Sequence, residues 1–233
     1  MALAAGASVL LYLASMIVAS GAAEGTEAGV QATQLIAIDQ DPTNAVVIPA
    51  ILQAIAIFLM AVPLFYIFAA ARKRSPAVRR EFIGFYFLGP ILIAAQFILF
   101  AVAVSDTAET FAGDHPELVR VAEQDGVDAL DVEEDSAIED EAEDAGDDDS
   151  TVATAQIVRL VGFLCFGIAL FYSGIWGMRT GLLTRFNGSF AMALGGVWAL
   201  SFFFGNLGYL VTVLWMIFVA FFFARGVHAR PPA

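Results

Sequence analysis

The chain has 233 residues, of which 59% are apolar and only 15% are charged. Soluble domains carry about 25% charged residues, so this composition argues against a soluble globular protein and indicates a polytopic membrane protein. The 24 acidic and 11 basic residues give a net charge of −13, which disfavours nucleic-acid binding. The single cysteine, Cys165, excludes an intrachain disulfide and a metal cluster held by cysteines alone.

Six apolar segments approach the roughly 20 residues that a helix needs to cross a bilayer core of about 30 Å. None of them has Asp, Glu or Lys in its interior. The last two are separated by a very short turn and must form an antiparallel hairpin. The sequence therefore predicts an all-α fold, a bundle of six transmembrane helices without significant β-sheet. The segments are 2–23, about 45–71, 82–104, 156–177, 189–205 and 207–224.

The first segment ends in small residues, in the run SGAAEG, as a cleaved signal peptide would. It lacks the positively charged region that begins such peptides, and its apolar stretch is long for one. We expect it to be retained as a transmembrane helix, with cleavage as the alternative. Further along, Leu35 to Ile38 are expected at the outer interface, and Asp41 and Pro42 are expected to start the second helix.

Basic residues are concentrated on one side of the predicted bundle. Nine of the 11 lie in the loop 72–80, in the loop after the fourth helix or at the C-terminus, whereas 23 acidic residues share the other side with Arg120 and Arg159. The positive-inside rule therefore places both termini in the cytoplasm, with Arg79 and Ser189 flanking cytoplasmic loops. The predicted location is the plasma membrane of a prokaryote, crossed several times.

The sequence divides at one long acidic loop. We expect transmembrane helices 1–3 in residues 1–104, an extracellular acidic loop in 105–153, and helices 4–6 with a short cytoplasmic tail in 154–233. Asp114 as N-cap, followed by Pro116 and Glu117, predicts a helix at the beginning of the loop. The rest, rich in acidic residues, is predicted to be largely disordered. It matches no calcium loop, which leaves a solvated repulsive segment or weak screening by divalent cations.

Polar side chains in the predicted spans gather at one depth. Tyr12, Gln53 and Gln96 each lie about 12 Å below the outer surface on a different helix, and Arg159 lies slightly above them on the fourth. Amides in lipid seek partners, so these residues are either interhelical hydrogen-bonding groups or the lining of an outward-facing polar pocket with Arg159 at its mouth. They are the candidate polar pocket.

Catalytic chemistry is not visible in the spans. The two histidines, His115 and His228, fall outside them, and the spans contain no carboxylate, although membrane enzymes and proton-coupled transporters normally place ionisable groups at membrane depth. We expect no catalytic residue, metal or cofactor. The expected partners are the lipid bilayer and a second copy or another membrane protein. The basic loop 72–80 is expected to set the topology, with binding of anionic lipid headgroups as the alternative. Small residues recur every fourth position, which favours close helix packing: Ala169, Ser173, Gly177 and Gly181, and Ala191, Gly195 and Ala199.

The run GIWGMRTGLLTRFNGSFAMALGGVWAL, residues 174–200, and the tail ARGVHARPPA resemble uncharacterised integral membrane proteins of high-GC bacteria. The runs GASVLLYLASMIVASG and DPTNAVVIPAILQAIAIFLMAVPLFYIF resemble the first two helices of the same domain-of-unknown-function family, whereas the acidic loop departs from it. The resemblance implies a six-helix plasma-membrane protein and carries no activity, substrate or cofactor. A haloarchaeal source would explain the acidic exterior and the single lysine equally well.

Together these observations favour a non-catalytic membrane component, such as a scaffold, an accessory subunit or an envelope factor. A small transporter or permease-like protein built around the polar pocket is the alternative. A membrane enzyme that acts on lipid is the second alternative.

Overall fold

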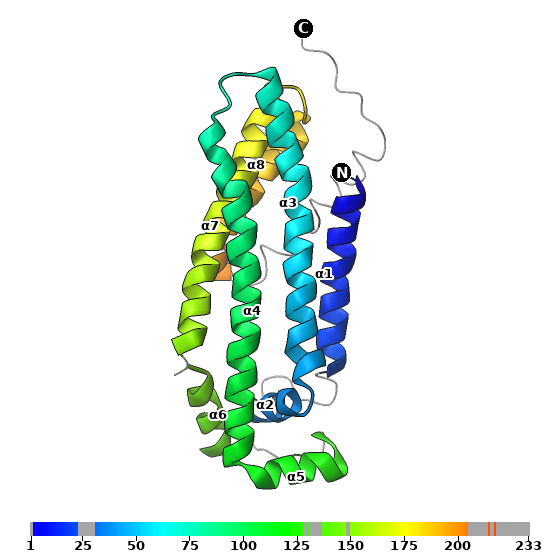
Figure 1. The fold of residues 1–233 in the computed structure, drawn as a ribbon, viewed down its shortest axis with the longest axis vertical. Coiled ribbons are helices and arrows are strands. Elements are labelled where there is room, and N and C mark those ends of the chain that lie inside the picture. The colour runs from blue at the N-terminus through cyan, green and yellow to red at the C-terminus, as the bar shows by residue number, and fades with distance from the viewer. Residues whose placement is uncertain are drawn as a thin grey trace. The chain divides into compact units, whose positions relative to one another are not determined.

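The computed structural model describes residues 2–22, 31–127, 130, 137–147, 150–204, 214 and 217. Every regular element in these ranges is helical, so the predicted all-α class is confirmed for the described part of the chain (Figure 1). The elements are α1 (Ala2–Ala22), α2 (Gln31–Gln40), the π-helix η1 (Thr43–Val47), α3 (Ile48–Arg74), the 3₁₀-helix η2 (Arg80–Phe82), α4 (Ile83–Asp114), α5 (Pro116–Asp125), α6 (Ala137–Asp147), α7 (Ser150–Arg179) and α8 (Arg185–Phe204).

Within the described part of the chain, three helices are long and apolar enough to cross a membrane, namely Thr43–Arg74, Arg80–Asp114 and Ser150–Arg179. A shorter apolar helix covers Leu3–Ala19 within α1. The fifth predicted span corresponds to α8, and the sixth, 207–224, lies outside the described residues apart from two isolated positions. The structure thus supports three helices of membrane length, and the count of six stays a prediction.

The second predicted helix begins where the sequence indicates. The backbone N–H of Asn44 donates to Asp41 Oδ1 over 3.1 Å, and the Asn44 side chain donates to Asp41 Oδ2 over 2.7 Å. Asp41 therefore caps the first turn, with Pro42 at the position where a missing N–H costs nothing. These hydrogen bonds favour the ionised carboxylate, so they lower the pKa of Asp41 from its usual value of 3.8.

Contacts within the chain divide it into two compact units, and α1, α3, α4 and α7 each contribute a part to both. Unit 1 comprises residues 1–12, 54–95 and 157–233, and unit 2 comprises residues 13–53 and 96–156. The candidate pocket residues are divided between the units: Tyr12 and Arg159 belong to unit 1, and Gln53 and Gln96 belong to unit 2.

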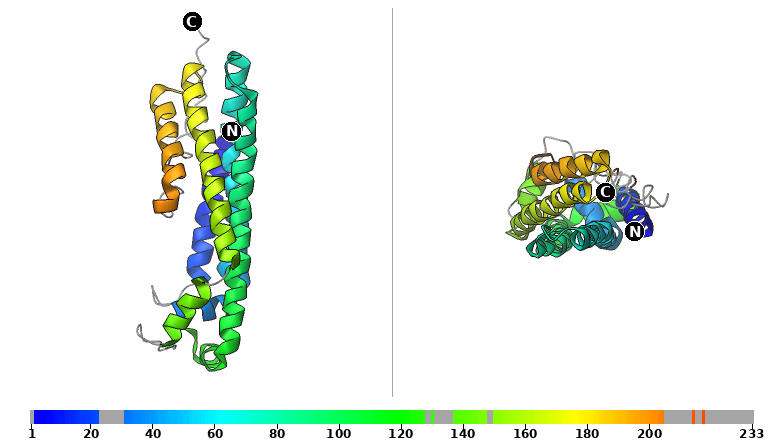
Figure 2. Two further views of the ribbon diagram at one scale, coloured as in Figure 1. Left: turned by 90° about the vertical axis from the view of Figure 1, so that its left-hand side faces the viewer. Right: turned by 90° about the horizontal axis from the view of Figure 1, so that it is seen from above.

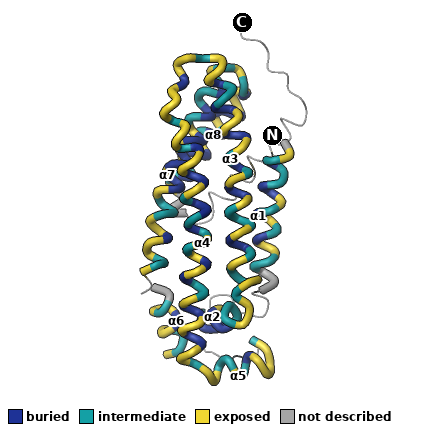
Figure 3. The backbone as a smooth tube through the Cα atoms, viewed as in Figure 1, coloured by how far each residue is buried: buried dark blue, intermediate teal, exposed yellow. Residues whose placement is uncertain are grey.

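Unit 1 is built on two helical hairpins, α3 with α4 and α7 with α8 (Figures 1 and 2). Along its described helices, buried and exposed residues alternate, so that each helix has one inward stripe (Figure 3). The indole ring of Trp198 on α8 is fully buried between Phe163 and Phe166 of α7, with ring centroids 4.7 and 4.9 Å away. Such edge-to-face aromatic contacts anchor the second hairpin.

Glycines set the closest approaches between helices in unit 1. A Cβ atom on Gly167 of α7 would lie 2.6 Å from the carbonyl oxygen of Gly195 on α8, and one on Gly174 would lie 2.6 Å from that of Gly188. Between α4 and α7, a Cβ on Gly89 would lie 2.9 Å from the backbone nitrogen of Phe166. Absence of a side chain at these positions lets the backbones pack directly, as small residues do in lipid.

Unit 2 has a small core of its own, built from α2, α5, α6 and the C-terminal end of α4. Leu35 and Ile36 of α2 are buried together with Phe111 near the end of α4, Ala122 of α5 and Ala142 of α6. The Glu139 carboxylate on α6 accepts the backbone N–H groups of the first two residues of α2, over 2.6 and 3.0 Å. Helix α2 is therefore held by apolar packing and by a carboxylate that satisfies its N-terminal donors.

This arrangement differs from the predicted acidic loop in two respects. Helix α4 continues to Asp114, so His115 rather than Asp114 precedes α5. Residues 137–147, within the stretch expected to be disordered, form α6. The physical reason is the spacing of Ile138 and Ala142, which gives α6 one apolar stripe that packs in the core around α2. Residues 128–129, 131–136 and 148–149 lie outside the described part of the loop.

Candidate functional site

The two candidate pocket residues in unit 1 have different surroundings. Tyr12 is 8% exposed. Arg159 is half-buried, and its guanidinium carbon lies 5.2 Å from the ring centroid of Phe163, a cation–π distance. The Nε atom of Arg159 is buried and has no hydrogen-bond partner among the described residues. The charge of Arg159 is thus accommodated by an aromatic face.

The two candidate pocket residues in unit 2 are amides on different helices. Gln96 on α4 is buried, with 7% exposure, and Gln53 on α3 is half-buried. The Oε1 atom of Gln96 is buried and accepts no hydrogen bond from the described residues, so it is not paired with the Gln53 amide. A common site made of these amides, Tyr12 and Arg159 stays a prediction, as does the expected short distance between the two glutamines.

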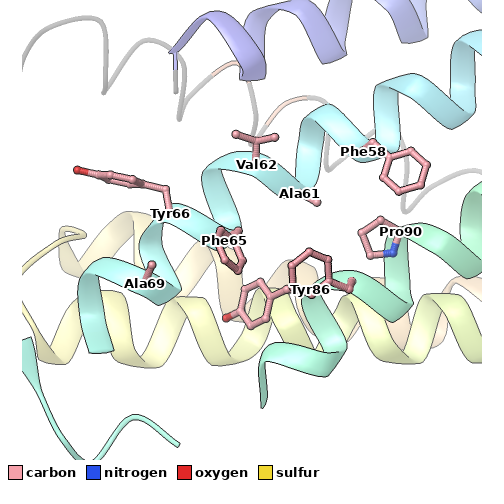
Figure 4. A pocket seen from close by; sticks show the side chains of 9 residues that line it. Phe58, Ala61, Val62, Phe65, Tyr66, Ala69, Tyr86 and Pro90 are labelled. Atoms are coloured by element: carbon pink, nitrogen blue, oxygen red, sulfur yellow. The ribbon is translucent and has the colours of Figure 1, made fainter. Parts of the chain in front are cut away.

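The structure instead presents an apolar groove between α3 and α4 in unit 1, with a volume of about 340 Å³ (Figure 4). That volume is at the lower end of the range for small-molecule sites. The rings of Phe65 and Phe87 lie across its middle, with centroids 5.5 Å apart. Nine residues line the groove: Phe58, Ala61, Val62, Phe65, Tyr66, Ala69, Tyr86, Phe87 and Pro90.

An aromatic cluster lies at the end of unit 1 that carries the basic loop. The rings of Phe82 and Tyr172 stack with centroids 4.0 Å apart, and the Tyr172 hydroxyl accepts the backbone N–H of Arg79 over 2.9 Å. Arg74 Nη1 donates to the carbonyl oxygen of Thr180 over 2.9 Å, in the turn after α7. The loop between α3 and α4 is therefore attached to α7 by hydrogen bonds as well as by packing.

Within the spans of unit 1, one hydroxyl pair joins two helices. Tyr86 Oη on α4 and Ser173 Oγ on α7 lie 2.7 Å apart, and both side chains are buried. The Tyr86 ring also packs against Phe68 of α3, with centroids 4.8 Å apart. A hydroxyl pair of this kind satisfies two polar groups that lipid could not, so its primary effect is structural.

A second hollow in unit 1, of about 250 Å³, lies over the contact between α7 and α8. Its floor is formed by Gly167 and Gly195, and its rim includes Phe82 and Tyr172. The hollow is a consequence of the missing side chains that let α7 and α8 approach each other. Among the described residues that line it, Tyr172 has the one polar side chain, and its hydroxyl accepts the backbone N–H of Arg79.

Unit 2 has a polar hollow of about 320 Å³ beside α5. Its charged lining residues are Asp39, Glu109, Glu123 and Arg120. Among the described residues no group of three or more His, Cys, Asp or Glu side chains has the arrangement of a metal site. Among the described lining residues of this hollow, three are acidic and one is basic.

His115, between α4 and α5, is largely enclosed, with 13% of its side chain exposed. Its ring packs on Phe111, and its Nδ1 and Nε2 atoms lie 3.4 Å from a Glu117 oxygen and 3.5 Å from a Glu141 oxygen. A protonated imidazole here would bridge α5 and α6. The arrangement supports a structural contact in unit 2 and contains no nucleophile.

Sequence reasoning singled out neither Tyr86 nor the groove around Pro90. The signal for the hydroxyl pair was present, because Tyr86 and Ser173 are among the few polar residues of their spans. The signal for the groove is the alternation of Ala61 and Ala69 with large aromatic residues on one face of α3, which becomes meaningful only once α4 is known to lie beside it.

Comparison with known proteins adds no relative: no family model, no curated protein and no solved structure matches this chain.

Proposed function

We propose that the chain is an integral membrane protein with a non-catalytic role, as a scaffold, accessory subunit or envelope factor. The observation that carries this proposal is that polar side chains of the membrane-length helices make hydrogen bonds within a helix or between helices. Tyr86 and Ser173 are paired with each other, and Thr107 donates to the carbonyl oxygen of Ala103 in its own helix. These groups stabilise helices and contacts between helices, which is what a structural component requires.

The proposed arrangement has six spans in the plasma membrane of a prokaryote, with both termini in the cytoplasm. It is supported by the three helices of membrane length and by the distribution of charge, since nine of 11 basic residues fall on the side assigned to the cytoplasm. The exposed large apolar side chains on these helices, such as Ile91 and Phe171, are suited to contact with lipid. The acidic unit 2 helices α5 and α6 would then face the exterior.

The proposed role implies a partner or a second copy in the membrane. Acidic residues of α5 and α6, including Glu117, Glu123, Glu143 and Asp144, are exposed on the helices that enclose the small core of unit 2. A folded acidic surface of this kind is suited to a basic partner on the outer side.

A small transporter is the second candidate, and one observation favours it. Gln96 Oε1 in unit 2 and Arg159 Nε in unit 1 are buried atoms that have no hydrogen-bond partner among the described residues. Unsatisfied polar atoms inside a membrane protein are costly and are normally explained by water or a ligand.

One reconstitution separates the two candidates. The purified chain is inserted into liposomes that contain a self-quenching dye, and the release of the dye, of potassium and of small polar solutes is compared with that from protein-free liposomes. For a structural component we expect identical release, together with a discrete complex on a non-denaturing gel of solubilised native membranes. Solute release that the Gln53→Leu, Gln96→Leu double variant abolishes, without loss of thermal stability, would contradict the structural role and support the transporter.

A further inference from the structure

The groove between α3 and α4 follows the half of α3 that ends at the basic loop (Figure 4). It extends along α3 from Phe58 to Ala69, a distance of about 17 Å at 1.5 Å per residue. The hydrocarbon core of a bilayer is about 30 Å thick, so the groove has the length of one leaflet.

The lining of the groove suits a flexible alkyl chain. Ala61 and Ala69 leave two hollows on α3, and the tilted rings of Phe65 and Phe87 enclose the space between them. Pro90 has no N–H group and closes the α4 side with an apolar ring. The hydroxyl of Tyr86 is turned to Ser173 and is unavailable to a ligand, so the interior offers contact rather than hydrogen bonds.

Positively charged side chains lie beyond one end of the groove. Arg72 and Lys73 lie one helical turn beyond Ala69 on the same face of α3, and Arg80 begins the short helix that leads into α4. All three are exposed. Arg80 has a weak contact of 3.8 Å with Glu81, and both of these side chains are mostly exposed. Residues 72–81 contain five basic residues and one acidic residue, so this end attracts anions.

The amphipathic Tyr66 also lies toward this end of the groove, where Figure 4 shows its ring directed away from Phe58. Tyrosine is enriched where hydrocarbon meets headgroups, because the ring is apolar and the hydroxyl is polar. The order along α3 is therefore apolar groove, interfacial tyrosine and then cations. This order matches the order of acyl chain, glycerol region and phosphate in a phospholipid.

We infer that the groove between α3 and α4 is a binding site for one anionic phospholipid, with an acyl chain along Phe58 to Ala69 and the phosphate held by Arg72, Lys73 and Arg80. We assign the site to a lipid rather than to a soluble anion, because a soluble anion would leave the apolar groove empty. It differs from a general attraction of the bilayer to basic residues, since only the cations beside the groove contribute to it. The inference rests on the proposed membrane location.

The test is native mass spectrometry of the full chain purified in detergent, with dioleoyl phosphatidylglycerol and dioleoyl phosphatidylcholine offered together in equal amounts. We expect one phosphatidylglycerol to be retained in preference to phosphatidylcholine. The Arg72→Gln, Lys73→Gln double variant should reduce this preference by about thirty-fold, which is about 2 kcal/mol, or about 1 kcal/mol per cation. Ala69→Leu, which fills one hollow, should reduce the retention of both lipids.

The matched control is the Arg179→Gln, Arg185→Gln double variant. It removes the same charge from exposed residues at the end of α7 and at the start of α8, neither of which lines the groove. We expect its preference to equal that of the unaltered chain. Equal losses in both double variants would overturn the site and leave only general charge attraction, and so would an unaltered chain that retains the two lipids equally.

A separate measurement keeps this inference distinct from the proposed function. Membranes that contain the chain are washed at alkaline pH before solubilisation, and the chain should stay in the pellet. A chain that stays in the pellet but has no lipid preference would overturn the groove site and leave the membrane role standing. A chain released by the wash would overturn both. Thermal midpoints of all variants confirm that each one is folded before lipid retention is compared.

Discussion

The hydroxyl oxygens of Tyr86 on α4 and Ser173 on α7 lie 2.7 Å apart in the buried part of unit 1. The pair lies beside Phe68, whose ring is 4.8 Å from that of Tyr86 and 6.3 Å from that of Tyr172. One hydrogen bond and a set of aromatic contacts thus connect three helices near the basic loop. Tyr86 also lines the α3–α4 groove. We therefore infer that its hydrogen bond to Ser173 holds this part of the groove lining in position.

Removal of one hydroxyl should destabilise the chain by leaving the other unpaired. We expect Ser173→Ala or Tyr86→Phe to lower the free energy of unfolding by about 0.6 kcal/mol, the average for hydrogen bonds between membrane helices, and by at most about 1.7 kcal/mol. The double variant should lose less than the sum of the two single losses. Denaturant titration in detergent micelles measures the effect. Thr110→Ala, which removes an exposed hydroxyl bonded to its own helix, is the control, and additive losses would show that the pair is not coupled.

Two adjacent glycines on α8 give a test of close helix packing. A Cβ atom on Gly195 would lie 2.5 Å from the carbonyl oxygen of Gly167, whereas one on Gly196 meets no atom within 4 Å. Gly195→Ala should therefore separate α7 from α8 at a cost of about 1–3 kcal/mol, and Gly196→Ala should be neutral or stabilising. The thermal midpoint in detergent is the measurement. The same midpoint for both variants would rule out direct backbone contact between the two helices.

The positions of the long helices could be predicted from the sequence, but their contacts and full lengths could not, since α4 continues to Asp114 and α7 begins at Ser150. Apolar length locates α3, α4 and α7, and Asp41 with Pro42 locates the beginning of the second helix. The small residues on α7 were expected at four-residue spacing, whereas the contacts to α8 use Gly167 and Gly174, seven residues apart. Alanine and glycine are so frequent in this chain that spacing alone does not select the contact face.

Attachment of α2 to α6 should depend on one carboxylate. Glu139→Ala removes the acceptor of the first two N–H groups of α2 and should cost about 1 kcal/mol, as loss of an N-terminal cap does. Glu143→Ala on the exposed face of α6 should have no such effect. Hydrogen exchange of residues 31–40 measures the difference. Unchanged exchange in Glu139→Ala would mean that apolar packing alone holds α2.

Protonation of Asp41 should loosen the first turn before α3. Its pKa is lowered by the two hydrogen bonds from Asn44, so the carboxylate stabilises the turn above pH 3.8, and this stabilisation is lost as the pH falls through the lower pKa of the folded chain. Protection of the Asn44 amide from hydrogen exchange should therefore fall as the pH is lowered below 3.8. Asp41→Asn should remove this dependence. Constant protection in the unaltered chain would contradict the role of the carboxylate.

The candidate site was harder to predict than the helices, because the sequence does not show how each helix is rotated about its own axis. Depth along a helix follows from counting residues, so Tyr12, Gln53 and Gln96 could be assigned to one layer. The direction of each side chain depends on which neighbours a helix has, and helices that are apolar all round give no periodic signal for this. The groove was missed for the same reason, since its lining residues become one surface only when α3 and α4 are paired.

The orientation of the chain in a membrane is the claim on which the account depends. The direct measurement is labelling of intact cells with a membrane-impermeant maleimide, in a Cys165→Ala background that removes the one native thiol. Ala77→Cys places a thiol in the exposed loop between α3 and α4, and Glu143→Cys places one on the exposed face of α6. We predict labelling of the α6 thiol on intact cells and labelling of the loop thiol only after permeabilisation. The reverse pattern, or labelling of both thiols on intact cells, would contradict the account.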